Sequence, residues 1–427
     1  MIKIIDCRNS DATPYLERPF SKGSDVGRVV EEIVAKVKEG GDKALSELSR
    51  TIEKVDLGEN FLVSEAEFTA ATAKISAELK DAIEVAITNI ERFHAAQKHH
   101  EVVVDSGDGV VCVQRSRAIS RVGLYIPGGT APLFSTVLML ALPSKIAGCK
   151  EVILCTPPAK DGSVAAEILY CAKACGVDKV YKIGGAAAIA AMAYGTETIK
   201  PCFKIFGPGN RYVTAAKQLV ASSQCSIDMP AGPSEVMVVC DETANSRFVA
   251  ADLLSQAEHG TDSQAIAVVL SKEMAQKVKT DTEAMVGELS RADFASLSLS
   301  NSSILIVKDK EQMLKVINEY APEHLIISTK DAETFALEVD NAGSIFIGNY
   351  TPESAGDYCS GTNHTLPTSG WAKSMSGVNL DSFCKKITYQ SISKEGIQRL
   401  APSIIAMANA EGLTAHALAA EVRREQL

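Results

Sequence analysis

The stretch RVGLYIPGGTAPLFSTVLMLALPSKIAGCKEVILCTPP (121–158) decides the fold class. Two short apolar runs, RVGLYIP and EVILCTPP, enclose a segment rich in alanine and leucine that is long enough to form a helix. An apolar run, a helix and a second apolar run make the pattern of a βαβ unit, in which the two strands lie parallel in one sheet. The stretch therefore predicts an α/β fold.

The same alternation continues toward the C-terminus and begins again after Pro233. We therefore expect two Rossmann-like domains, each built on a parallel sheet. The segments that carry this prediction are AAEILYCAKACG (165–176), KVYKIGG (179–185), AAAIAAMAYG (186–195), EVMVVCD (235–241), FVAADLLSQAEHG (248–260), QAIAVVLS (264–271), SSILIVKD (302–309), HLIIST (324–329) and GSIFIG (343–348).

Both ends of the chain have helical periodicity. From about Gly27 to Phe93, apolar residues recur at three- and four-residue spacing, which predicts an N-terminal helical region. Beyond Ser382 we expect helix again, with Thr414 capping the last one. The segment 349–370 is rich in Gly, Pro, Ser, Thr and Asn and has no periodicity. We expect it to be a long irregular loop with a functional role.

Composition limits the classes of partner. The chain has 427 residues, 46% of them hydrophobic, which suffices for about three domains with sizeable cores. The net charge of −10 argues against a nucleic acid or an anionic membrane as the main partner, and favours a small ligand. The first residues do not resemble a signal peptide, and no apolar run approaches the roughly 20 residues that cross a bilayer. We expect a cytoplasmic protein.

The eleven cysteines contain no CxxC pair, so we expect free thiols in a reducing compartment. Glycine-rich turns occur at 126–132, 183–193 and 206–210, although the dinucleotide fingerprint GxGxxG is absent. In the second turn, a helix from Ala186 follows a short strand, so its free amides could face an anionic group. Tight packing of a βα turn explains the same glycines.

Candidate metal ligands come from three places. Gln256 and His259 lie three residues apart near the end of an expected helix, so they share one face, although a solvated helix end is an alternative. Asp357 offers a carboxylate from the irregular segment, or forms a turn there. His416 falls in the first turn of the last helix, where the helix dipole favours neutral imidazole, the form that binds metals. An exposed helical histidine is the other interpretation.

Glu323 and His324 are the acid and base candidates. They are adjacent in NEYAPEHLII (318–327), between a proline and a strand-like apolar run. α/β proteins place reactive groups in loops at strand ends. An acidic residue beside a histidine is also common without any function.

These segments together resemble the histidinol dehydrogenase family over nearly the whole chain. The segments that carry the resemblance are VGLYIPGGTAPLFSTVLML (122–140), KIFGPGN (204–210), DMPAGPSEV (228–236), LLSQAEHG (253–260), APEHLII (321–327), TPESAGDY (351–358), SGTNHTLPT (360–368) and LTAH (413–416). The resemblance implies oxidation of histidinol to histidine through histidinal with two NAD reduced, the last steps of histidine biosynthesis.

The resemblance also implies the residues of the site. Glu323 and His324 correspond to the catalytic pair. The expected ligands of one Zn²⁺ per subunit are Gln256, His259, Asp357 and His416, the last reaching the site of the neighbouring subunit in a homodimer. The positions expected to contact histidinol are Ser234, Gln256, His259, His324, Asp357, Glu411 and His416, and those expected to contact NAD are Tyr125, Ala187 and Asn210.

Ala187 departs from the family pattern. The family has GGAQAIA where this chain has GGAAAIA, and the glutamine is a cofactor contact. An alanine side chain cannot donate or accept a hydrogen bond, and losing one neutral hydrogen bond costs about 0.5–1.5 kcal/mol. We therefore expect weakened, but not abolished, NAD binding.

The expected division of the chain has four parts: an N-terminal segment (1–19), a first α/β domain with the metal and catalytic residues (20–118 and 233–381), a second, NAD-binding α/β domain (119–232), and a helical tail that reaches the partner (382–427). Two other classes of function stay open. One is a zinc-dependent amide hydrolase in which Glu323 activates water. The other is a binding protein that descends from the enzyme and has lost catalysis.

Overall fold

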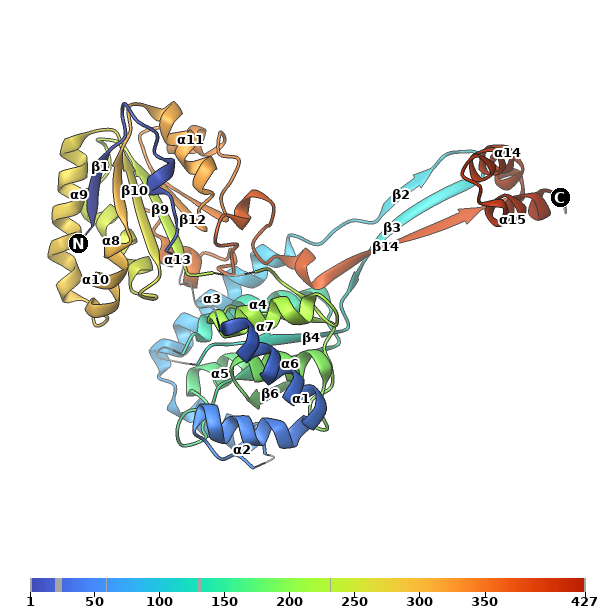
Figure 1. Ribbon diagram of the computed structural model, residues 1–427, viewed down its shortest axis with the longest axis horizontal. Helices are drawn as coiled ribbons and strands as arrows, with labels where there is room; N and C mark the ends of the chain where they lie inside the picture. The colour runs from blue at the N-terminus through green and yellow to red at the C-terminus, as the bar shows by residue number, and fades with distance from the viewer. Residues whose placement is uncertain (1, 20–24, 59, 129–131, 231, 426–427) are drawn as a thin grey trace. The chain divides into compact units, whose positions relative to one another are not determined.

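A computed structural model describes residues 2–19, 25–58, 60–128, 132–230 and 232–425 (Figure 1). The chain forms two compact units. The first unit comprises Met1–Ala96 and Ile119–Phe383, and the second comprises Gln97–Ala118 and Cys384–Leu427.

The first unit contains a six-stranded sheet in which every neighbouring pair is parallel. All residues of its central strands are buried. Continuous apolar strands of this kind are expected where both faces of a parallel sheet are covered. In spatial order, the strands are β1 (Lys3–Asp6), β11 (Ser303–Ile306), β10 (Gln264–Val269), β9 (Glu235–Cys240), β12 (His324–Ser328) and β13 (Ser344–Ile347).

Two hydrophobic clusters cover the faces of this sheet. Val236 and Val238 of β9 pack in one cluster with Leu253, whereas Met237 packs in the other with Ile317. The alternation follows from the two-residue period of a strand. The helices that accompany the sheet are α8 (Ser246–Ala257), α9 (Lys272–Met285), α10 (Ala292–Ser300), α11 (Lys310–Tyr320), α12 (Ala332–Ala336) and α13 (Glu353–Tyr358).

The same unit contains a second parallel sheet of five strands. Its strands lie in the order third, second, first, fourth, fifth, which is the order of dinucleotide-binding folds. The prediction of an α/β fold with two parallel sheets is therefore confirmed. In spatial order, the strands are β6 (Lys179–Lys182), β5 (Glu151–Thr156), β4 (Arg121–Tyr125), β7 (Lys204–Phe206) and β8 (Ser226–Ile227), and the helices are α4 (Phe134–Ala147), α5 (Ala166–Ala174), α6 (Gly185–Tyr194) and α7 (Arg211–Ala221).

The N-terminal helical region is present as α1 (Val26–Leu48), α2 (Glu65–Lys74) and α3 (Ala77–Ala95). Its place differs from the expected division, because Val30 and Val34 of α1 share one core with Tyr181 and Ile189 of the five-stranded sheet and its helices. The first residues are also not a separate segment, since β1 pairs with β11 along its length. Periodicity shows that a helix has an apolar face, but not which sheet covers that face.

The second unit has an antiparallel sheet of β2 (Val102–Asp105), β3 (Val110–Ala118) and β14 (Cys384–Ile392), followed by α14 (Lys394–Ala410) and α15 (Thr414–Glu425). The prediction of helix directly beyond Ser382 was therefore wrong for β14. This segment contains Ile387, Thr388 and Tyr389, side chains that favour strands, and all nine of its residues pair with β3. The last helix begins at Thr414, so Thr414 is its first helical residue, whereas the sequence predicted it as the N-cap that precedes the helix.

Three further findings concern the sequence predictions. The segment 349–370 is not wholly irregular, because it contains the six-residue helix α13. Residues 129–131 of the glycine-rich turn at 126–132 lie outside the described residues, as does Ala231 of DMPAGPSEV. Within the part of the chain that is described, no helix combines the length and apolarity needed to cross a membrane.

Leu253→Ala should lower the free energy of unfolding by about 2–5 kcal/mol, because it leaves a cavity beneath α8. Leu253 is fully buried against β9. Leu297→Ala is the matched control, since Leu297 on α10 is 56% exposed and its truncation should change little. Urea unfolding followed by circular dichroism measures both, and equal losses would contradict the packing described here.

Candidate functional site

The catalytic candidates lie at the amino ends of β9 and β12. His324 is the first residue of β12, and it stands opposite Val236 of β9. α8 follows β9 and runs back across the sheet, so its last turn brings Gln256 to the same end, where it contacts both Glu323 and His324. The site is thus at the amino ends of these strands, and not at the carboxyl ends, where open α/β sheets usually bind ligands.

His324 is buried and contacted on both ring nitrogens. Its Nδ1 lies 3.2 Å from the main-chain oxygen of Glu235 and 3.4 Å from Nε2 of Gln256. Its Nε2 lies 3.5 Å from Oδ1 of Asp357. The ring is therefore held between β9, the end of α8 and the helix α13.

Glu323 is also buried, and its carboxylate is held by the neighbouring strand. Oε2 accepts a hydrogen bond from the main-chain N–H of Glu235 at 2.9 Å and one from Nε2 of Gln256 at 3.4 Å. The main-chain oxygen of Glu323 accepts a hydrogen bond from Ser344 N–H at 2.9 Å. A Cβ on Gly343 would lie 2.5 Å from that oxygen, so β13 can approach Glu323 closely because residue 343 is glycine.

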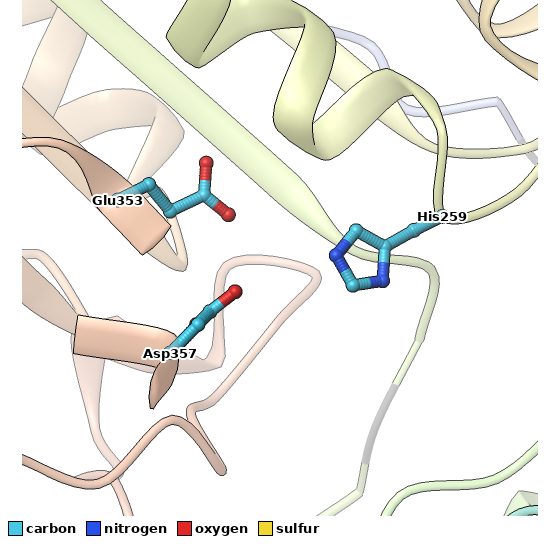
Figure 2. Close-up of side chains that lie close together, drawn as sticks. All are labelled: His259, Glu353 and Asp357. Atoms are coloured by element: carbon cyan, nitrogen blue, oxygen red, sulfur yellow. The ribbon is translucent and has the colours of Figure 1, made fainter. Parts of the chain in front are cut away.

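A candidate metal centre lies beside this pair. One ligand atom from each of His259, Glu353 and Asp357 lies within 4.8 Å of the others, and Figure 2 shows both carboxylates directed toward the space beside the imidazole ring. Glu353 was not predicted as a site residue. Its position in TPESAGDY, four residues before Asp357, gave a usable signal, because that spacing puts two side chains on one face of a helix.

The donor set suits a divalent cation. Oε1 of Gln256 and Oε1 of Glu353 are buried and have no hydrogen-bond partner among the described residues. Leaving such atoms unsatisfied costs about 1–3 kcal/mol each, so an electropositive group is expected against them. Imidazole nitrogen, amide oxygen and carboxylate oxygen without thiolate form a set that accepts zinc and other divalent metals.

The pKa shifts of the groups in the cluster also favour a bound divalent cation. Burial raises the pKa of Glu323 to about 8. Burial alone would lower the pKa of His324, but the carboxylates of Glu353 and Glu323, with that of Asp357, raise it to about 10. Burying these carboxylates together is therefore unfavourable for their charged forms. A divalent cation among the carboxylates would offset this charge and lower the pKa of His324 toward neutrality.

Glu235 contacts Glu323 and His324 through its main chain, and Arg18 holds the Glu235 carboxylate. The guanidinium donates two hydrogen bonds to the Glu235 carboxylate, at 2.6 and 2.9 Å, and one to the main-chain oxygen of Tyr320 at 2.8 Å. Ser369 N–H donates to the same carboxylate at 2.7 Å. Bidentate pairing of this kind fixes orientation as well as charge. Arg18 had no role in the sequence analysis, since nothing local connects it with residue 235.

The three residues expected to contact NAD line one cavity of about 930 Å³. The hydroxyl oxygen of Tyr125 accepts a hydrogen bond from Gly185 N–H at 3.1 Å, at the start of α6. Ala187 lies in the first turn of α6, and Asn210 caps α7 through its side-chain oxygen. His259 lines the same cavity. The volume of the cavity is at the upper end of the range for cofactor sites, which suits a dinucleotide.

The remaining predicted residues are placed as follows. Ser234 directly precedes β9 and is half-buried beside Glu235. Glu411 and His416 lie in the second unit, at the end of α14 and in the first turn of α15, and both are exposed. The structure therefore brings together Gln256, His259, Glu323, His324 and Asp357, whereas Glu411 and His416 are not part of the described cluster.

Comparison with known proteins decides the family, since residues 16–424 match the family model described as histidinol dehydrogenase. The chain belongs to the histidinol dehydrogenase family. Histidinol dehydrogenase of Bacteroides fragilis strain YCH46 is 54% identical over 412 residues, which cover 96% of both chains. Histidinol dehydrogenase of Bacteroides thetaiotaomicron is 52% identical over 428 residues, covering all of both.

Solved structures agree with this assignment. The crystal structure of histidinol dehydrogenase from Elizabethkingia anophelis superposes with a TM-score of 0.96 at 46% identity, covering 100% of this chain and 98% of that one. The family resemblance inferred from the sequence segments is therefore confirmed. The match covers both parallel sheets and the second unit, so the histidinol dehydrogenase fold extends over the whole chain.

Arg18→Met should destabilise the protein by about 3–5 kcal/mol, because it removes the cation that balances a buried carboxylate. The double variant Arg18→Met with Glu235→Gln should lose less than Arg18→Met alone, since glutamine carries no charge and still offers an oxygen to Ser369 N–H. Urea unfolding of both variants tests this. If the double variant is the less stable of the two, Arg18 does not act through Glu235.

Proposed function

We propose that this chain is a zinc-dependent histidinol dehydrogenase, which oxidises L-histidinol to L-histidine through histidinal and reduces two NAD. Family membership over the whole chain supports the reaction. The observation that carries the site is the meeting of a three-ligand cluster, His259, Glu353 and Asp357, with the buried pair Glu323 and His324. His259 of the three-ligand cluster also lines a cavity of cofactor size.

In this proposal, Gln256, His259 and Asp357 bind the zinc ion, and His416 of a second copy completes the set. Bound zinc would supply a Lewis-acid anchor for the imidazole and amino nitrogens of histidinol, and NAD would supply the hydride acceptor. The unpartnered Oε1 of Gln256 and the position of Asp357 beside His324 support this assignment. Glu353 adds a carboxylate that balances the charge of the ion.

His324 is the proposed general base for the alcohol. A base within reach must take the hydroxyl proton as hydride leaves the carbinol carbon, and imidazole is the side chain best suited near neutral pH. Contacts to Glu235 and Gln256 fix the ring, so Nε2 is the nitrogen available to the substrate. Asp357 lies 3.5 Å from that nitrogen and helps to orient it.

Glu323 is the proposed base for the second oxidation. The aldehyde must add water before another hydride can leave, and a carboxylate can remove a proton from that water. The hydrogen bonds from Glu235 N–H and Gln256 keep the carboxylate within the buried site. His324 then takes the hydroxyl proton of the hydrate, as it does that of the alcohol.

Substrate selection involves the second copy as well. We propose that Ser234 and Glu411 contact histidinol together with the metal ligands and His324, with Glu411 and His416 coming from the partner of a homodimer.

Tyr125 and Asn210 contact NAD, and Ala187 weakens NAD binding relative to a glutamine at that position. Ala187 lines the cavity, which supports an effect on the cofactor.

The proposed location is the cytoplasm. No disulfide bond joins cysteines of the described residues, and most of the cysteines are buried. Free thiols persist in a reducing compartment, whereas an oxidising one favours disulfides.

Incubation of the purified protein with L-histidinol and excess NAD should yield two molecules of NADH per histidinol. Chelation should abolish turnover and zinc should restore it, because the ion anchors the substrate. Asp357→Asn should lower both turnover and bound zinc, measured by NADH absorbance and atomic emission. Asp262→Asn, an exposed neighbour of His259 outside the cluster, is the control. Full turnover in metal-free protein would refute the zinc assignment.

Mixing two inactive variants tests the shared site. His259→Ala damages the site of its own chain, whereas His416→Ala should damage that of the partner. A heterodimer of the two then keeps one intact site, so an equal mixture refolded or coexpressed should recover about a quarter of the parent activity. Variants mixed without subunit exchange serve as the control. No recovery in proven heterodimers would show that His416 acts within its own chain.

A further inference from the structure

Glu53 places a carboxylate in the cavity that Tyr125, Ala187 and Asn210 line. It is the last residue of η2 (Ser49–Glu53), the short π-helical turn that follows α1. Its Oε1 accepts a hydrogen bond from Gly184 N–H at 2.8 Å. Burial raises the pKa of Glu53 to about 7.

The carboxylate lies beside the carboxyl end of β5. A Cβ built on Gly184 would lie 2.4 Å from Oε1 of Glu53 and 2.6 Å from Cβ of Pro157. Pro157 is the first residue after β5, so glycine at 184 lets the carboxylate, the end of β5 and the start of α6 meet in one place.

The carboxyl end of the second strand has a defined role in dinucleotide-binding folds. There, an acidic residue about 20 residues beyond the first glycine-rich turn, at the end of the second strand, binds the hydroxyl groups of the adenosine ribose. In this sheet β4 is the first strand and β5 the second, in the same spatial order. The residues after β5 are Pro157 and Pro158, neither of which is acidic. Glu53 supplies a carboxylate at that position from a distant segment.

The charges around the cavity distinguish NAD from NADP. Among the described lining residues, Arg291 is the one lysine or arginine, and it donates to the main-chain oxygen of His259 at 3.4 Å, at the metal cluster. Among the described groups, those that shift the pKa of Glu53 are its buried surroundings, Gly184 N–H and the Ser49 hydroxyl, and none of them is a cation. A 2′-phosphate beside this carboxylate would meet like charge at low dielectric, with no described cation to balance it.

We infer that Glu53 binds the 2′-hydroxyl of the adenosine ribose and thereby selects NAD over NADP. The inference rests on the proposed function, because it requires that the cavity bind the dinucleotide. The ribose hydroxyl donates to the carboxylate, which keeps its hydrogen bond from Gly184 N–H. The same carboxylate repels a 2′-phosphate, so one side chain provides both the attraction and the exclusion.

Fluorescence titration with NADH and with NADPH tests this in the parent protein and in Glu53→Gln. Glutamine keeps an oxygen for Gly184 N–H but removes the charge. The parent should bind NADH more tightly than NADPH. The dissociation constant of NADPH divided by that of NADH should fall by about 10-fold to 100-fold in Glu53→Gln, because hydrogen bonds to charged groups are stronger than those to neutral groups. The ratio of kcat/KM for NAD and NADP should fall in parallel.

Two further variants separate charge from structure. Glu47→Gln removes one carboxylate from α1 at an exposed position that pairs with Lys36, outside the cavity lining, and should leave the ratio unchanged. Glu53→Asp keeps the charge and should keep the preference for NADH. Thermal unfolding of each variant verifies that it is folded.

The outcomes are distinct. A parent protein that binds no NADH would overturn this inference together with the proposed function. A parent that prefers NADH, with an unchanged ratio in Glu53→Gln, would overturn this inference alone. A folded Glu53→Gln that binds neither nucleotide would also overturn it, because Glu53 would then maintain the shape of the cavity and not discriminate between the cofactors.

Discussion

The carboxylates of Glu323 and Glu353 lie buried beside the imidazole of His324, and holding them there costs solvation free energy. The protein recovers part of this cost through neighbours: a main-chain N–H and an amide for Glu323, and the hydroxyl of Ser255 for Glu353. The remainder appears as raised pKa values for both carboxyl groups. The cluster therefore requires a compensating positive charge, which the proposed cation would provide.

The six-stranded sheet brings the groups of this cluster together, because residues from three separate segments meet at the amino ends of β9 and β12. β9 contributes the main chain of Glu235, α8 contributes Gln256 from its last turn, and α13 contributes Glu353 and Asp357 from one face. The rigid parallel strands fix the main-chain atoms, so the side chains converge with little freedom. Arg18 balances the charge of the Glu235 carboxylate, while the main chain of Glu235 contacts Glu323 and His324.

In the proposed function, the five-stranded sheet binds the dinucleotide, although its turns lack the GxGxxG fingerprint. Its strand order provides a binding edge at the carboxyl ends of the strands, and paired glycines at the start of α6 allow close approach. The acidic residue comes from outside the βαβ unit, through the turn that ends at Glu53. α1 makes this possible because its apolar face packs into the core of this sheet.

Much of this could be inferred from the sequence, because the apolar runs of buried parallel strands and the spacing of amphipathic helices are local properties. They fixed the α/β class and the two sheets, and the family segments pointed to Gln256, His259, Glu323, His324 and Asp357. Other features were decided by tertiary structure: the packing of α1 on the five-stranded sheet, the pairing of β14 with β3, and the contacts of Glu353, Arg18 and Glu53. Arg18 and Glu235 are 217 residues apart in the chain, and Glu53 and Gly184 are 131 apart. A local pattern shows which face of an element is buried, whereas its partner is set by the packing of the whole chain.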